Sequence, residues 1–176
     1  DIVFICKMIQ CLKMNNLEFW TLFPFRQIYF GIKGQYFDPT ISAMSNEQRD
    51  ALKIVSRLLE DPYNQICADC QCKPSKWAST TLGVFICIDC SGVHRSLGTH
   101  ISFVRSCTLD SWSMDQVRLM EAIGNRLGNS YWEAKLPADF ERPGNSNRSL
   151  MQNFIKEKYQ LKKWADEGPP PHIVYK

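Results

Sequence analysis

Apolar residues recur at helical spacing in the stretch that follows Ser45. The residues that would share one helical face, as in an amphipathic helix, are Ala51, Leu52, Ile54, Val55, Leu58 and Leu59. Ser45 with Gln48 three residues later is typical of a capping box, which begins a helix. Asp61-Pro62 would end it. The pattern therefore predicts a helix between Ser45 and Asp61.

Further along, short β-prone stretches and helical stretches alternate with turn residues. Aromatic and β-branched residues favour strands at Trp77–Thr81, Val84–Cys87 and Phe103–Cys107. Capping patterns and stop signals favour helices over Ile88–Leu97 before Gly98, from Ser113 and Gln116 to Gly124, over Asn129–Leu136 before Pro137, and after Ser149 and Gln152. Together these elements predict an α+β fold, a small and mostly helical domain with a minor three-stranded antiparallel sheet.

The two ends of the chain show other patterns. The last predicted helix has an inner face of Leu150, Met151, Phe154, Ile155 and Tyr159. The tail from Gly168 to Pro171 cannot continue a helix and should be extended or disordered. Residues 1–43 hold nine of the 21 aromatic residues without helical or alternating spacing, so they stay unassigned. Met44 is a candidate natural start. Residues 19–30 are either an apolar contact surface, ordinary buried chain or part of a foreign extension.

Composition narrows the class of protein. In 176 residues, 44% are hydrophobic and 22% charged, which excludes wholesale disorder. The net charge of +3 falls well short of a strong nucleic-acid signature. No apolar run approaches the about 20 residues of a membrane-spanning helix, and no signal-peptide pattern follows Asp1. We therefore expect a cytoplasmic protein with reduced thiols.

Four of the eight cysteines are spaced as metal ligands. Cys67 with Cys70 and Cys87 with Cys90 form two Cys-x-x-Cys pairs, separated by sixteen residues. Two such turns can complete a tetrahedral thiolate shell around one zinc ion. A closed shell leaves no position for water, so this zinc would be structural. Cysteines that merely pack, or form disulfides, are the alternatives. The other thiols are expected to be ordinary or free, with Cys72 a weaker candidate ligand: Cys6, Cys11, Cys72 and Cys107.

The residues after Cys90 separate the possible functions. DNA-binding fingers with similar cysteine spacing need a run of basic residues there. Residues 91–110 contain only two Lys or Arg residues, Arg95 and Arg105. This argues against DNA binding. Five helical steps place Arg95 about 140° around the helix from Cys90. It would therefore point outward from a base that the metal holds. His94, about 40° from Cys90, should pack over the cluster.

The order Cys-x₂-Cys-x₁₆-Cys-x₂-Cys-x₄-Arg, filled by the four cysteines and Arg95, resembles the GTPase-activating proteins for ADP-ribosylation factors, the ArfGAP family. The surrounding sequence, from about Gln48 to Trp164, is similar to the family as well. It most resembles the stromal-membrane-associated type and its plant relatives. Matching segments include Trp77-Ala78-Ser79, Cys90-Ser91-Gly92-Val93-His94-Arg95, Leu109-Asp110-Ser111-Trp112 and Phe154-Ile155-Lys156-Glu157-Lys158-Tyr159.

The resemblance implies an ArfGAP domain at residues 44–167, a zinc finger at 67–90 and a Pro-rich tail at 168–176. Such a domain accelerates GTP hydrolysis by a GTP-bound Arf-family GTPase, without an independent active site. Arg95 takes the place of the family's arginine finger, supplied in trans. Trp77 matches an aromatic that buttresses the finger and contacts the partner. Asp110 matches a family position that either supports the local structure or contacts the GTPase.

The same resemblance implies a place in vesicle trafficking, peripheral to Golgi, endosomal or plasma membranes through the GTPase. No nucleic acid is expected as a partner, and no adaptor motif is encoded in this segment. Asn125 should have a structural role, and His100 should be satisfied within the fold. The alternative is a non-catalytic zinc-finger scaffold that binds a GTPase or a trafficking adaptor.

Overall fold

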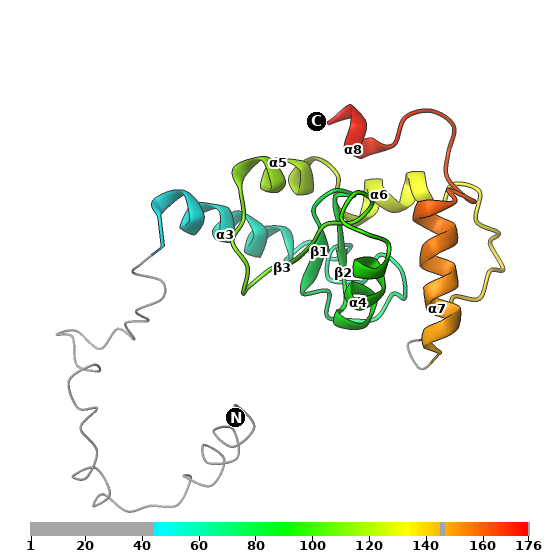
Figure 1. Ribbon diagram of the computed structural model, residues 1–176. Helices are drawn as coiled ribbons and strands as arrows, with labels where there is room; N and C mark the ends of the chain where they lie inside the picture. Colours follow the sequence, from blue (N-terminus) through cyan, green and yellow to red (C-terminus); the bar gives the residue numbers. More distant parts are fainter. Residues whose placement is uncertain (1–43, 145–146, 176) are drawn as a thin grey trace, which may run out of the picture. The chain divides into compact units, whose positions relative to one another are not determined.

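Helices and three short strands make up the part of the chain that the computed structural model describes, residues 44–144 and 147–175 (Figure 1). All of them belong to the unit Met44–Lys176. The hypotheses on residues 1–43 lie outside the described residues. In chain order the elements are α3 (Asn46–Leu58), β1 (Trp77–Ser79), β2 (Val84–Ile86), α4 (Ile88–Ser96), β3 (Val104–Ser106), α5 (Met114–Ala122), α6 (Gly124–Trp132), α7 (Arg148–Ile155), the π-helix η2 (Lys156–Gln160) and α8 (Pro171–Val174).

The strands form one antiparallel sheet in the order β2-β1-β3. Trp77 on the central strand pairs with Ile86 on one side and Ser106 on the other. The connection from β1 to β2 passes through Gly83 at φ 75°, a conformation that a residue with a Cβ rarely adopts. The predicted α+β class and three-stranded antiparallel sheet are thus confirmed.

The two predicted capping boxes differ in the structure. Ser113 and Gln116 form a complete box at the start of α5. Ser45 accepts from Gln48 N at the start of α3, but the Gln48 side chain accepts from Trp112 N instead of completing the box. The first helix is therefore confirmed, and its capping glutamine also ties it to the residues before α5.

Helix α6 begins earlier than the sequence indicates. Gly124, at φ 60°, ends α5 and starts α6 at once, so the helix covers Gly124–Trp132 rather than Asn129–Leu136. The predicted bounds are wrong because a left-handed glycine redirects the chain within one residue. Pro137 does not set the end of α6, since the helix has already ended at its C-cap Glu133.

The C-terminal elements also depart from the prediction. Asn147, rather than Ser149, caps α7 by accepting from Leu150 N. This start leaves Leu150 exposed, although the other predicted inner-face residues are buried. The expectation of an extended or disordered segment from Gly168 to Pro171 is wrong at Pro171, which begins the short helix α8 (Pro171–Val174). Pro171 can begin α8 because the first position of a helix needs no N–H partner.

Two buried clusters occupy the two faces of the sheet, because successive strand residues point to opposite sides. Ala78 and Phe85 pack with α3 and α5 in one cluster. Val84 and Ile86 pack in the larger cluster, which includes side chains of α6 and α7 and three of the paired cysteines. The metal-ligand candidates are therefore built into the main core. Within the described residues, no helix has the length and apolar content of a membrane span.

Candidate metal centre and arginine surface

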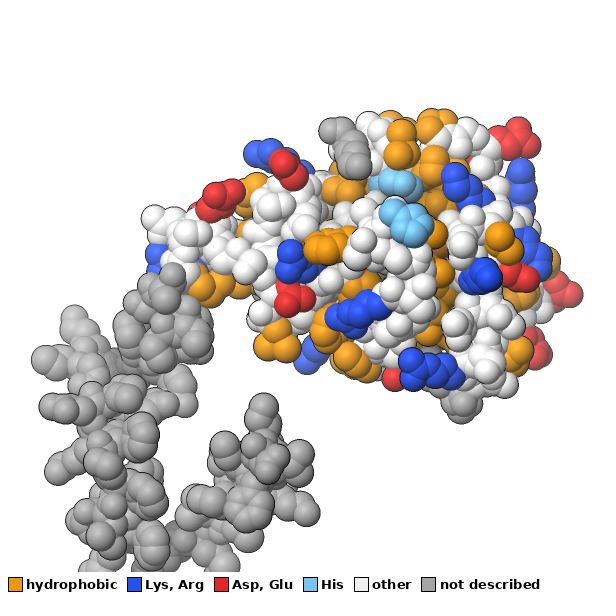
Figure 2. Space-filling view, in the orientation of Figure 1, with side chains coloured by type: hydrophobic (Ala, Val, Ile, Leu, Met, Phe, Trp, Pro, Cys, Tyr) orange, Lys and Arg blue, Asp and Glu red, His pale blue; other side chains and the backbone are white. Residues whose placement is uncertain are grey.

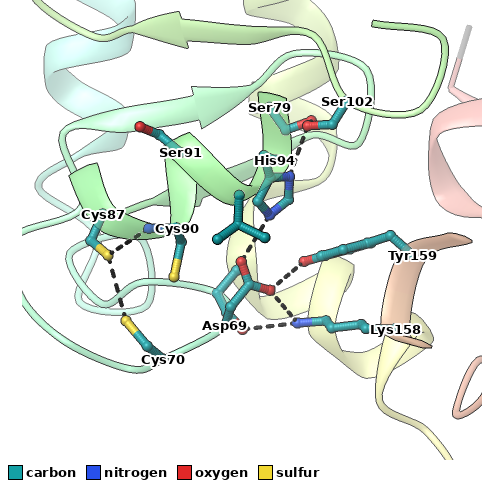
Figure 3. A network of polar contacts seen from close by, with 12 residues as sticks. Asp69, Cys70, Ser79, Cys87, Cys90, Ser91, His94, Ser102, Lys158 and Tyr159 are labelled. Carbon is teal, nitrogen blue, oxygen red and sulfur yellow. Dashed lines mark hydrogen bonds and ion pairs between the residues drawn. The ribbon is translucent and has the colours of Figure 1, made fainter. Parts of the chain in front are cut away.

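The four paired cysteines converge. Cys67 and Cys70 lie in the loop before β1, Cys87 caps the N-terminus of α4, and Cys90 lies in its first turn. Their Sγ atoms all lie within 4.8 Å of one another, and Cys70 Sγ and Cys87 Sγ are 3.5 Å apart (Figure 3). A zinc–sulfur distance of about 2.3 Å gives a tetrahedron with edges of about 3.8 Å. The donor set and its spacing therefore fit one tetrahedral metal ion.

The chemistry of the thiols also calls for a cation. Hydrogen bonding with Cys67 lowers the pKa of Cys70 to about 7 and lowers that of Cys87 still further. Hydrogen bonds within the same group raise the pKa values of Cys67 and Cys90. Four thiolates this close would repel one another, so a divalent cation would be needed to hold all four together. Tetrahedral sulfur ligation is typical of zinc or iron–sulfur centres.

The remaining described cysteines lie outside this group. Cys72 is exposed, and Cys107 is buried, where desolvation raises the pKa of its thiol to about 12. Neither belongs to the set of close ligand atoms, so Cys107 is a neutral core residue, as expected. Cys6 and Cys11 lie outside the described residues.

Arg95 projects from the outward face of α4. Its side chain is exposed, while Cys90 is fully buried. The guanidinium carbon lies 4.7 Å from the centre of the Trp77 ring, a cation–π contact. Arg95 Nη1 also donates to Ser91 Oγ at 3.3 Å. The candidate ligand Cys90 and the exposed Arg95 thus lie on opposite sides of α4, as the sequence predicts.

His94 lies beneath Arg95, fully buried, and packs over the cysteine loop as predicted. Its Nε2 lies 2.9 Å from Asp69 Oδ2, and Asp69 stands between the ligands of the first pair. Its Nδ1 lies 2.8 Å from Ser102 Oγ, which donates to Ser79 Oγ on β1 (Figure 3). A chain of polar contacts thus joins the cysteine loop, α4 and the central strand, which carries Trp77.

Lys158, for which the sequence pattern predicted no role, is a buried cation beside the cysteine loop. Its Nζ donates to four oxygens: Ala68 O at 2.9 Å, Asp69 Oδ1 at 3.1 Å, Asn129 Oδ1 at 3.0 Å and Glu133 Oε1 at 2.7 Å. One signal was available, since Lys158 follows buried Phe154 by four residues and so falls on the inner face of the helical pattern.

Asp69 is held ionised by its neighbours. Burial would raise the pKa of Asp69, but the charges of Lys158 and His94 and their hydrogen bonds hold it well below its usual range. Tyr159 donates to the same carboxylate at 2.9 Å. Burial, followed by the charge of Asp69, raises the pKa of Tyr159 well above its ordinary value. The network therefore keeps one anion and its donors fixed behind the metal site.

Asn125 has the structural role expected of it. Its Oδ1 accepts from Phe85 N at 2.6 Å, and its Nδ2 donates to Phe85 O at 3.0 Å and to Ile66 O at 2.7 Å. Its own N–H donates to Asn64 Oδ1 at 2.8 Å. The side chain therefore joins the start of α6 to β2 and to the residue before Cys67.

The other predicted residues are less enclosed. Asp110 Oδ2 accepts from Ser106 N at 2.7 Å, which fixes the turn after β3 and leaves the carboxylate partly exposed. His100 is exposed rather than satisfied within the fold. Two large apolar residues without a predicted role are exposed: Ile88, 59% exposed on α4, and Leu109, 83% exposed beside Asp110.

Comparison with known families identifies this arrangement. Residues 52–168 match the ArfGap family model, described as "Putative GTPase activating protein for Arf". The chain belongs to the ArfGap family. The same fold occurs in the solved ArfGap domain of HIV-1 Rev binding protein, with a TM-score of 0.63 at 24% sequence identity over 70% of this chain and 92% of that one.

Curated relatives match over the same region. The chain is 53% identical over 116 residues to a probable ADP-ribosylation factor GTPase-activating protein, AGD15, of Arabidopsis thaliana. It is 44% identical over 123 residues to human stromal membrane-associated protein 1. These matches cover 66% and 70% of this chain but only 47% and 26% of the relatives. This ArfGap chain thus spans less than half of their length.

Proposed function

We propose that residues 44–167 activate GTP hydrolysis on Arf-family GTPases in their GTP-bound form, with Arg95 as an arginine finger supplied in trans. The observation that carries this proposal is the placement of Arg95. It is exposed on α4, and the same helix is anchored through Cys87 and Cys90. Trp77 lies against its guanidinium. Family membership supports the same activity.

The physical chemistry of phosphoryl transfer suits such a residue. Little covalent help is needed, and catalysis consists mainly of positioning and of neutralising charge on the transferring group. Arginine is always protonated and can direct two N–H donors at phosphate oxygens. A finger supplied in trans is worth about 10³–10⁵ in rate. Magnesium and the residue that orients water would come from the GTPase.

The cysteine group would hold one zinc ion in a structural role. Cys67, Cys70, Cys87 and Cys90 supply four thiolates, which fill a tetrahedral shell and leave no position for water or substrate. When bound, zinc would supply rigidity rather than Lewis-acid chemistry. It would fix the start of α4 and therefore the base from which Arg95 extends.

The surface around Arg95 supports contact with a protein partner. Trp77 is half-buried, Ile88 precedes Arg95 by seven residues and thus shares its face of α4, and Leu109 lies beside Asp110 in the loop after β3. Exposed apolar and aromatic residues around a central arginine are typical of interface anchors. We assign Trp77, Ile88, Leu109 and Asp110 to GTPase contact, with the Asp110 carboxylate also accepting from Ser106 N in its own turn.

The protein would then act in vesicle trafficking. It would work in the cytoplasm, at the surface of the Golgi, endosomal or plasma membranes where its GTPase partner resides. Measuring hydrolysis across a panel of Arf proteins would identify the preferred partner.

Single-turnover hydrolysis on GTP-loaded Arf tests the assignment. Arg95→Ala and Arg95→Lys are each expected to lower the stimulated rate about 10³-fold or more, because lysine lacks the forked donors. Arg118→Ala, a change at an exposed arginine on α5 paired with Asp115, is the matched control and should keep the wild-type rate.

The bound zinc of every variant is measured in parallel. Wild-type rates in Arg95→Ala with zinc retained would exclude the finger. A wild-type protein that binds GTP-loaded Arf without accelerating hydrolysis would indicate the non-catalytic scaffold instead.

A further inference from the structure

Ser106, the last residue of β3, forms hydrogen bonds to the loop that follows it through three different groups. Its Oγ accepts from Thr108 N at 3.3 Å and from Leu109 N at 3.1 Å. Its N–H donates to Asp110 Oδ2 at 2.7 Å, and its C=O accepts from Trp112 Nε1 at 2.9 Å. One residue, only 2% exposed, thus fixes the course of the loop between β3 and α5.

The pairing of the sheet leaves the main chain of Ser106 available for these contacts. β3 lies at the edge of the sheet, and Cys107 N donates to Lys76 O, just before β1. In an antiparallel ladder, hydrogen-bonded pairs alternate with pairs that exchange no hydrogen bonds. The adjacent pair, Ser106 with Trp77, is therefore of the second kind. The N–H and C=O of Ser106 point away from β1, toward the loop.

The same pair connects this loop to the arginine surface. Residues directly opposite each other in an antiparallel pair have their side chains on the same face of the sheet. The Ser106 side chain thus shares a face with Trp77, whose ring centre lies 4.7 Å from the guanidinium carbon of Arg95. The loop that carries Leu109 is therefore anchored beside the Trp77–Arg95 contact.

Leu109 is exposed, which by itself does not mark an interface. Figure 2 shows hydrophobic side chains interspersed with Lys and Arg on one face of the domain, and single exposed apolar residues are ordinary on protein surfaces. Leu109 is the most exposed of the large hydrophobic residues that the structure describes, at 83%, and it lies in a loop. Its backbone is therefore held by Ser106 rather than by regular secondary structure.

We propose that Ser106 is a positioning residue, which holds its loop in the conformation that presents Leu109 to the GTPase. This inference rests on the proposed function, which assigns Leu109 to the partner. Ordering a loop on binding lowers affinity, and a loop that is already ordered in the free protein avoids this cost. Ser106 therefore acts on the affinity for the GTPase, measured as KM, and leaves the chemical step at Arg95 unchanged.

Steady-state kinetics on GTP-loaded Arf tests this role. Ser106→Ala removes the acceptor of two loop N–H groups and keeps both main-chain bonds. KM should rise about 3- to 10-fold, the factor that a neutral hydrogen bond typically contributes, with kcat within about twofold of wild type. Ser75→Ala is the matched control, because Ser75 is also 2% exposed but its hydroxyl donates to Asn64 O. This control should keep the wild-type KM.

A double-mutant cycle with Leu109 separates positioning from a general loss of structure. Leu109→Ala removes the contacting side chain, so the further change Ser106→Ala should then raise KM less than about twofold, because residues that act together are not additive. The full increase in the Leu109→Ala background would overturn the inference. So would a KM of Ser106→Ala equal to that of Ser75→Ala, or a fall in kcat at constant KM.

Hydrogen exchange of the unsubstituted protein tests the loop without relying on the folding of Ser106→Ala. The Leu109 amide should be protected from exchange although its side chain is 83% exposed, because this amide donates to a buried hydroxyl. Exchange as fast as that of an unstructured chain would rule out a loop held by Ser106.

If the wild type does not accelerate hydrolysis, the proposed function fails, and the Kd for Arf loaded with a non-hydrolysable GTP analogue replaces KM as the measurement. A Kd unchanged in Ser106→Ala, or no binding by the wild type, would then overturn the role of Ser106 as well. Loss of the stimulated rate in Arg95→Ala, with Ser106→Ala equal to wild type, would overturn only the role of Ser106.

Discussion

Lys158 and Arg95 are both cations near the cysteine group, but Lys158 is buried and Arg95 is exposed. Lys158 has no exposed surface and donates to four oxygens. Arg95 is exposed, and its polar and ring contacts with the described residues are those with the Trp77 ring and the Ser91 hydroxyl. A buried charge without partners costs several kcal/mol, so the Lys158 ammonium needs hydrogen-bond and ion-pair partners in the interior. An exposed guanidinium keeps its hydration and can exchange weak contacts for those of a partner.

Replacing Lys158 by methionine should strongly destabilise the domain. The change keeps an unbranched side chain of nearly the same length but leaves buried Asp69 and largely enclosed Glu133 without their shared counterion. Breaking a buried ion pair in this way costs about 3–5 kcal/mol. Urea unfolding followed by circular dichroism, at a fixed free zinc concentration, measures the loss.

Lys163→Met is the matched control. Lys163 pairs with Glu157 at the surface, with about half of its side chain exposed, and such pairs are worth about 0–1 kcal/mol. Equal losses of unfolding free energy in the two variants would show that the buried network contributes no more to stability than a surface ion pair.

At the scale of elements, the junction between α5 and α6 determines how the chain reaches the metal site. Gly124 turns the chain at φ 60°, and Asn125 directly after it holds β2 and the residue before Cys67. Asn64 Oδ1 accepts from Asn125 N at 2.8 Å. One left-handed residue and two amide side chains thus set the position of the first cysteine pair relative to the sheet.

Gly124→Ala should lower the free energy of unfolding by about 1–2 kcal/mol, the cost of a left-handed conformation for a residue with a Cβ. The new methyl group would also lie 3.1 Å from Asn64 Oδ1, the atom that accepts from Asn125 N. Urea unfolding at fixed zinc measures the change.

Gly92→Ala serves as the control, because Gly92 lies in α4 without a positive φ and the nearest side-chain atom is 3.8 Å from the added carbon. Alanine is favoured over glycine inside a helix, so stability should be unchanged or slightly higher. A Gly124→Ala protein as stable as the wild type would show that the turn at this position does not require glycine.

At the scale of the whole domain, the candidate metal ligands belong to the larger of two cores. Cys67, Cys87 and Cys90 are buried in the same cluster as Trp132 and Ile155, whereas the cluster on the other face of the sheet contains no member of the four-cysteine group. Loss of the metal would therefore loosen the core that holds α4, α6 and α7 together.

Metal removal should unfold at least this part of the domain. Structural zinc contributes about 10–16 kcal/mol to folding, which matches or exceeds the net stability of about 5–15 kcal/mol of an ordinary domain. Circular dichroism before and after addition of a strong chelator measures the loss of helix. Cys90→Ser should reproduce it, and Cys72→Ser, at an exposed cysteine outside the group, should retain one zinc per chain. Full helicity in the metal-free protein would contradict the structural role.

Local patterns predicted much of this architecture. The first helix, the strands, the start of α5 and the cysteine group were predictable, because helical periodicity, capping residues and Cys-x-x-Cys turns are local properties. The outward position of Arg95 followed from its spacing after Cys90. The bounds of α6 and α7 were not predictable, since Gly124 and Asn147 act through one φ angle and one side-chain contact that no periodicity reveals.

The sequence by itself determined the class of fold, the four candidate ligands and the family resemblance, all of which depend on the order and spacing of neighbouring residues. Only the tertiary structure decided which polar residues share the interior with the metal site. Lys158, Glu133 and Asp69 lie far apart in the chain and meet because η2 and the end of α6 pack behind the cysteine loop, which carries Asp69. The packing of α7 against α4 was decided in the same way. Such long-range meetings follow from packing geometry, which local sequence patterns do not encode.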